Sequence, residues 1–220
     1  DNVNATIDRL RSFQRSTGDF AYWPGQNYVN EWGTNYAGHF LLEAQKLGYD
    51  VSSTILDRWI KAQHKLSREW QMRSSRYDQV TQAYRLYTLA LANEPSLGAM
   101  NRLREAQQLN DQAAWRLAAA YAVAGKSDVA KEMILKLSTD VEDYTELSGS
   151  YGSALRDNAM MLETLTHMGE RQKGGALVQV LSNQLSRRRW YGTHTTSYCL
   201  LAIGKFVGNQ DRSENFTFTY

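Results

Sequence analysis

A pattern that recurs about every 40 residues constrains the fold of this chain more than any other feature. Each copy opens with polar residues and continues with aromatic and small residues at helical spacing, and most copies stop at a glycine. We therefore predict helices over residues 34–48, 77–95, 112–125, 155–169 and 194–208. A left-handed glycine just past the helix end is predicted at Gly48, Gly125, Gly169 and Gly208.

More polar amphipathic segments separate these copies. They carry charge on one face, whereas the copies themselves are apolar over most of their surface. This contrast predicts outer helices that are wet on one side and inner helices that are packed all round. The outer helices are predicted at residues 4–15, 51–65, 97–109, 127–137 and 171–187. With two prolines in 220 residues the chain is predicted to be all-α, with its helix pairs either strung into a solenoid or closed into an α/α toroid.

Charge and cysteine content narrow the function classes. A net charge of +2, with basic and acidic residues interspersed, argues against a nucleic-acid partner. The one basic cluster, Arg187-Arg188-Arg189, is interpreted as a solvated turn before Trp190. The single cysteine, Cys199, excludes an internal disulfide and a multi-cysteine metal site, and we predict neither a metal nor a cofactor. No apolar run approaches the roughly 18 residues that a membrane span requires.

Two stretches resemble a known family. They are GDFAYWPG from Gly18, continued by WGTNYAGHFLLEAQKLGYDV from Trp32, and WYGTHTTSYCLLAIGKFVG from Trp190. Over nearly the whole chain the sequence resembles the helical thioester-type domain of bacterial alpha-2-macroglobulins. The resemblance implies an α/α toroid of inner and outer helix pairs, a terpenoid-cyclase-like superhelix, with its first inner helix expected upstream of this chain. It also implies a toroid domain over residues 1–208 and, in the tail 209–220, the candidate start of a following β-sandwich domain.

The same resemblance implies a function without enzymatic activity. Proteins of this family trap proteases: cleavage of a bait region elsewhere triggers a conformational change that encloses the attacking protease. The expected partners are therefore target proteases, met through the full-length protein, and neighbouring macroglobulin-like β-sandwich domains. A location in the cell envelope, periplasmic or surface-exposed, is expected on the same ground.

The chain departs from the thioester-bearing members of the family. Their Cys-x-Glu-Gln motif, which forms the internal thioester, does not occur in these 220 residues, and Cys199 is followed by Leu-Leu-Ala. Some members also use a histidine after the second helix pair to assist acyl transfer. Here that stretch reads SREWQMRSSRYDQVTQAY, with Trp70 and Gln71 and no histidine. The sequence therefore does not support thioester transfer to hydroxyl groups by this segment.

The aromatic residues between the first two predicted helices are the candidate functional residues. Trp and Tyr anchor protein interfaces and stack on sugars. We interpret these residues chiefly as a loop that caps the end of the helix assembly, with Gly25 and Gly33 supplying turns, and otherwise as contacts to a neighbouring domain. The set is Tyr22, Trp23, Tyr28 and Trp32.

An α/α-toroid enzyme that acts on carbohydrate or isoprenoid substrates is the alternative. A glycosidase would need two acids about 5 to 10 Å apart, and the candidate pairs are Glu31 with Glu43 and Asp157 with Glu163. No residue is predicted to be catalytic, because such pairs also arise by chance among the 23 acidic residues.

Two further residues suggest a zinc site, namely His194 and Cys199, because protein prenyltransferases hold zinc on a similar fold. Residues five apart on a helix point about 140° from each other, and the remaining ligands are missing. We therefore interpret Cys199 as a core residue and His194 as a polar group at a helix start.

Overall fold

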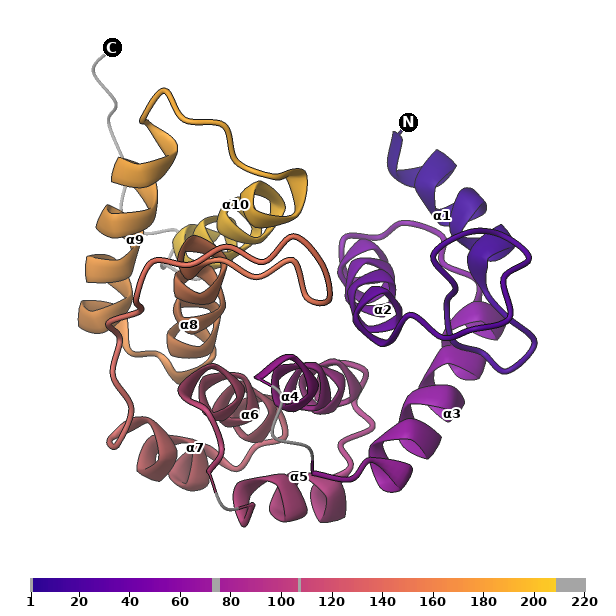
Figure 1. Ribbon diagram of the computed structural model, residues 1–220, viewed down its shortest axis with the longest axis horizontal. Coiled ribbons are helices and arrows are strands. Elements are labelled where there is room, and N and C mark those ends of the chain that lie inside the picture. Colours follow the sequence, from indigo (N-terminus) through magenta and orange to yellow (C-terminus); the bar gives the residue numbers. More distant parts are fainter. Residues whose placement is uncertain (1, 73–75, 107, 209–220) are drawn as a thin grey trace. The chain divides into compact units, whose positions relative to one another are not determined.

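The computed structural model describes residues 2–72, 76–106 and 108–208 (Figure 1). Within these residues the secondary structure consists of ten α-helices, with isolated β-bridges at Gln14–Phe20 and Thr145–Ser153 and no longer strand. This confirms the all-α prediction. The tail 209–220, the candidate start of a β-sandwich domain, lies outside the described residues.

Each of the ten predicted segments overlaps one of the observed helices, with ends that differ by up to five residues. The helices are α1 (Asn2–Phe13), α2 (Glu31–Lys46), α3 (Ser53–Glu69), α4 (Arg76–Leu91), α5 (Leu97–Arg104), α6 (Asp111–Val123), α7 (Ser127–Ile134), α8 (Ala154–Met168), α9 (Arg171–Leu185) and α10 (Thr193–Gly208).

Glycine marks three of the helix ends as predicted. Gly48, Gly125 and Gly169 have φ of 89°, 73° and 72°, a region that favours a residue without a Cβ. The prediction for Gly208 is wrong, because α10 continues through this glycine and includes it as its last residue. The apolar pattern of α10 runs to Val207, so its final turn extends further than the glycine signal suggested.

The chain divides into two compact units, Asp1–Leu137 and Ser138–Tyr220. The first holds α1 to α7 and the second holds α8 to α10. The single toroid domain over residues 1–208, and the closure of its helix pairs into a ring, stay predictions.

In the first unit α4 and α6 form the centre of the core. Residues 79–90 of α4 and 113–121 of α6 are buried throughout, whereas α3, α5 and α7 each keep an exposed face. Figure 1 shows α3, α5 and α7 lying on one side of α2, α4 and α6. The predicted contrast between inner and outer helices is therefore confirmed within this unit.

In the second unit α8 packs against both α9 and α10. Cys199 is fully buried between helices, with its Sγ 3.8 Å from the Leu155 carbonyl oxygen. Burial raises the pKa of the Cys199 thiol to about 12. These observations agree with the interpretation of Cys199 as a core residue.

Candidate functional site

The segment 18–30, which we call the aromatic loop, has a buried base and an exposed tip. At the base Asp19, Phe20 and Ala21 are buried. The Ala21 amide donates to the Phe13 carbonyl at 3.0 Å, and the Phe20 amide donates to Thr34 Oγ1 at 2.9 Å. The base is thereby attached to α1 on one side and to α2 on the other.

An ion pair and a buried amide fix the start of the aromatic loop. Arg15 donates to Asp19 Oδ1 at 3.0 Å, and Thr17 also donates to this carboxylate. Gln14 Nε2 donates to the Gly18 carbonyl at 3.0 Å and to the Ile55 carbonyl of α3 at 2.9 Å. Because backbone and side-chain bonds converge here, the base is a rigid support for the residues that follow.

The tip carries three of the four candidate aromatic residues. Tyr22, Trp23 and Tyr28 are 47%, 59% and 59% exposed, and the rings of Tyr22 and Trp23 meet edge to face at 5.4 Å between centroids. Gly25 has a φ of 80°, which confirms that it supplies a turn. Large aromatic side chains exposed on a supported loop offer contact area that a partner can cover.

Trp32 lies elsewhere than expected. Asn30 caps α2, accepting the Gly33 amide at 2.7 Å, so the helix begins at Glu31 and includes both Trp32 and Gly33. The predicted turn at Gly33 is therefore wrong. Trp32 is 2% exposed and packs on Tyr84 of α4, with ring centroids 5.0 Å apart, so it belongs to the core and not to the exposed tip. The Asn cap is the sequence signal that would have placed this boundary.

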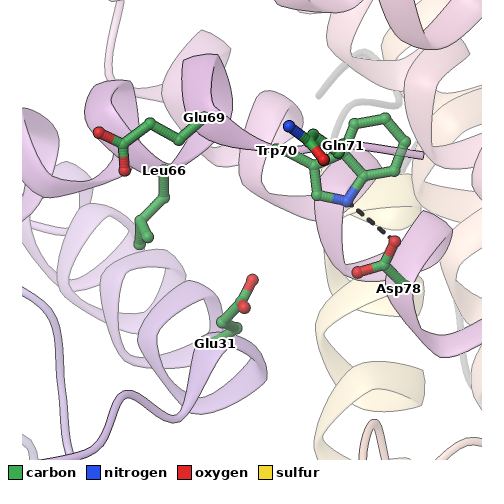
Figure 2. Close-up of a pocket in the computed structure, with 6 residues that line it drawn as sticks. All are labelled: Glu31, Leu66, Glu69, Trp70, Gln71 and Asp78. Atoms are coloured by element: carbon green, nitrogen blue, oxygen red, sulfur yellow. Dashed lines mark hydrogen bonds between the residues drawn. The ribbon is translucent and has the colours of Figure 1, made fainter. Parts of the chain in front are cut away.

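An acidic pocket of about 160 Å³ opens beside the starts of α2 and α4 (Figure 2). Trp70, which ends α3, donates from its indole nitrogen to Asp78 Oδ2 at 3.1 Å. The pocket is lined by Glu31, Leu66, Glu69, Trp70, Gln71 and Asp78. Trp70 and Gln71 belong to the stretch SREWQMRSSRYDQVTQAY quoted above, whereas the three carboxylates of the pocket were not singled out together from the sequence.

A buried arginine lies beside this pocket and pairs with one of the acids that line it. Arg85 of α4 pairs with Glu31, and its Nε donates to Gln63 Oε1 at 3.3 Å. Gln63 in turn donates to Asn35 Oδ1 at 2.6 Å. Burial lowers the pKa of Arg85, and the nearby Glu31 acts in the opposite direction. Arg85 is the one charged residue between Val80 and Leu91, and this isolated charge on a predicted inner helix was the sequence signal for such a partner.

The acids of the pocket also have a structural role. Glu31 and Asp78 lie in the first turns of α2 and α4, where a negative charge stabilises the helix. Burial and the charge of Glu31 raise the pKa of the neighbouring Tyr77 phenol. We therefore interpret the pocket as a helix-terminal polar network, and the aromatic tip as the stronger candidate for a contact site.

One candidate carboxylate pair is too widely spaced, and the acids of the other pair are held by other side chains. Glu31 and Glu43 are twelve residues apart on α2, which corresponds to about 18 Å along the helix axis. On α8, Asp157 accepts from Arg156 and from the Tyr144 hydroxyl, whereas Glu163 pairs with Lys205 at 2.7 Å. Neither arrangement favours the two-acid chemistry of a glycosidase.

His194 is the second residue of α10, as a polar group at a helix start should be. Burial, with a further contribution from Arg156, lowers its pKa to about 4. The ring of Tyr198 lies 5.0 Å from the His194 ring, centroid to centroid. Cys199 lies on the same helix and contacts Leu155 of α8 instead.

No profile of a known protein family matches the chain. Among characterised proteins it is similar to alpha-2-macroglobulin of Escherichia coli (strain K12), with 29% identity over 216 residues. This similarity covers 91% of the chain and 13% of that relative. The chain therefore spans a small fraction of the relative's length.

Solved structures give the same result. A crystal structure of native alpha-2-macroglobulin from Escherichia coli, spanning the residues from domain MG7 to the C-terminus, matches with a TM-score of 0.78 and 26% identity. This match covers 94% of the chain and 34% of that structure. A crystal structure of trypsin-activated alpha-2-macroglobulin from Escherichia coli matches with a TM-score of 0.74 and 26% identity, over 92% of the chain and 14% of that structure.

Proposed function

Because the chain is homologous to bacterial alpha-2-macroglobulins, we propose that it is a non-enzymatic helical module of a protease-trapping protein. The module supplies a scaffold and a contact surface, and target proteases are met through the full-length protein. The observation that supports the contact surface is the aromatic loop. Its base is fixed to α1 and α2, while its tip exposes Tyr22, Trp23 and Tyr28.

The chemistry of the tip favours a protein partner. Residues 20–30 contain no Lys, Arg, Asp or Glu, and the centres of protein interfaces are depleted of charge and enriched in Tyr and Trp. The relative is much longer than this chain, so a protein of this kind has further domains that can cover the tip. We propose a macroglobulin-like β-sandwich domain as that partner, in a protein of the cell envelope.

No acyl-transfer step is assigned to this chain. The sequence has no Cys-x-Glu-Gln motif. Its one thiol, Cys199, is fully buried, and a pKa raised to about 12 leaves almost none of it as the reactive thiolate. Cys199 is therefore not proposed as the cysteine of a thioester.

Trapping is tested with the full-length protein that carries this chain. After incubation with trypsin we expect cleavage of a large protein substrate to fall and cleavage of a small peptide substrate to persist, because enclosure bars only large molecules. Equal loss of both activities would indicate a blocked protease active site, and no loss of either would indicate no trapping. Both of these results would contradict the proposal.

The loop is tested by comparing the full-length protein with the 220-residue chain. Trp23→Ala is expected to lower the melting temperature of the full-length protein and to leave that of the chain unchanged, because the ring is exposed in the chain alone. Backbone amides of residues 20–30 should also exchange more slowly in the full-length protein. Leu135→Ala removes an exposed side chain outside the loop and is the matched control. Equal effects of Trp23→Ala on both proteins would contradict a contact at the tip.

A further inference from the structure

The turn between α9 and α10, residues 187–191, exposes three consecutive arginines and a tryptophan. Arg187, Arg188 and Arg189 are all exposed, and Trp190 is 86% exposed. This confirms a solvated turn, but solvation alone does not account for a nearly fully exposed indole. Large exposed aromatic side chains beside positive charge mark surfaces that bind a partner. We call these five residues the Arg–Trp turn.

Local contacts hold the Arg–Trp turn in shape. The Tyr191 hydroxyl donates to the Gln184 carbonyl at 3.1 Å, which ties the turn to the last residues of α9. The Arg189 guanidinium lies 5.8 Å from the centroid of the Tyr191 ring, and the Arg189 amide donates to the Arg187 carbonyl at 2.7 Å. The two residues around Trp190 are thus held to their neighbours, while the indole itself extends into solvent.

The charged residues of α9, the Arg–Trp turn and α10 are all basic. Residues 171–208 contain six Lys and Arg residues and no Asp or Glu, although the whole chain has a net charge of only +2. Lys205 is paired with Glu163 of α8. Among the described residues none of the three arginines of the turn pairs with a carboxylate. The turn therefore presents three guanidinium groups to an outside ligand.

We propose that the Arg–Trp turn docks on an anionic phospholipid surface. Guanidinium groups bind phosphate in a bidentate manner, and indole rings favour the headgroup region of a bilayer. Electrostatic attraction to anionic lipids and insertion of one apolar side chain are each weak, but together they give reversible membrane binding. Among the described residues, no helix combines the length and the apolar character of a membrane span.

The shape of the feature favours a membrane over other anionic partners. A nucleic acid is held by basic residues spread along a groove, whereas here the charge lies at one projecting turn. An acidic protein would need a pocket complementary to a protruding indole. A bilayer accepts such a ring without a preformed pocket. The inference uses residues of the second unit and does not depend on the proposed role of the aromatic loop.

Flotation of the 220-residue chain with vesicles tests the proposal. We expect binding to phosphatidylglycerol-rich vesicles and none to pure phosphatidylcholine vesicles. Replacing the three arginines with Gln should reduce partitioning roughly 100-fold, at about a factor of five for each basic residue. Trp190→Ala should reduce it about 10-fold. All four side chains are exposed, so the variants should keep the wild-type melting temperature.

Matched controls remove the same charge, or an exposed apolar side chain, elsewhere. Replacing the exposed Lys61, Lys65 and Arg68 of α3 with Gln lowers the net charge equally, and this triple variant should partition within about threefold of wild type. Leu135→Ala removes an exposed apolar side chain outside the turn and should also bind as wild type. Equal losses from the two triple variants, or no binding to anionic vesicles, would overturn the proposal. Tighter binding to a DNA duplex at equal phosphate concentration would overturn it in favour of a nucleic-acid surface.

Discussion

Gly38 of α2 lies directly against the indole of Trp59 of α3, and a Cβ at position 38 would be 2.1 Å from Trp59 Cε2. The indole cannot withdraw freely, because Trp59 is fully buried and its Nε1 donates to the Thr34 carbonyl at 2.9 Å. The absence of a side chain at one residue therefore sets the spacing between α2 and α3, and with it the support for the aromatic loop.

Gly38→Ala should destabilise the chain. Ala is the better helix former by about 1 kcal/mol, but forcing a methyl group into a packed site costs about 1–3 kcal/mol or more. We expect the overlap to dominate and the free energy of unfolding, measured with urea, to fall. Gly98→Ala in α5 meets no atom within 4 Å and is the control, with an expected gain of up to about 1 kcal/mol. A gain at both positions would show that Trp59 does not limit the packing.

Asn30→Ala should shorten or fray the start of α2. The Asn30 side chain accepts the Gly33 amide at 2.7 Å, and loss of such a cap costs about 1 kcal/mol. Thermal unfolding measures the loss, and hydrogen exchange at residues 31–34 should rise. Asn30→Asp keeps an acceptor oxygen and should remain close to wild type. If the two variants were equally destabilised, the cap would not be the cause.

Asp157→Ala should be among the most damaging single changes in the second unit. Asp157 accepts from the buried Arg156 at 2.7 Å and from the Tyr144 hydroxyl at 2.6 Å. Removing the carboxylate takes this counter-ion from a buried guanidinium, which costs about 3–5 kcal/mol. Tyr144→Phe removes the hydrogen bond to Asp157 and a longer one from Arg156 at 3.4 Å, and the first should cost about 1.5–3 kcal/mol in the same urea experiment. A smaller loss for Asp157→Ala than for Tyr144→Phe would contradict this order.

His194 should make the chain less stable as the pH falls. Burial, with the charge of Arg156, lowers its pKa to about 4 from an ordinary value of about 6.5, so the unfolded chain binds the proton more readily. The contribution is fully present above about pH 6.5 and is lost as the pH falls toward 4. Between pH 7 and pH 5 this residue should cost about 2 kcal/mol.

The check is urea unfolding of wild type and His194→Gln at both pH values. Arg156, Tyr151 and Tyr198 are among the groups that face His194, and all three are kept in the variant. The difference between the two proteins therefore isolates the histidine. An identical pH dependence would show that this imidazole titrates normally.

The amino-acid pattern alone predicted most of the secondary structure. Helix formation depends on side chains three and four residues apart, and this local information is present in each repeat. The same holds for Gly48, Gly125 and Gly169, where a left-handed residue ends a helix. The predictions at Gly33 and Gly208 were wrong. The cap at Asn30 decides where α2 begins, and the apolar pattern of α10 carries that helix through Gly208.

The sequence by itself determined that this chain is helical, where its helices lie, and which of them are wet on one face. Only the tertiary structure separated Trp32, buried against Tyr84, from Trp23, exposed on the loop, because burial depends on which distant helix packs there. The tertiary structure also decided the ion-pair partners of the two buried arginines, Glu31 for Arg85 and Asp157 for Arg156. A buried charge must find its counter-ion in space, and no local spacing rule says on which helix that counter-ion lies.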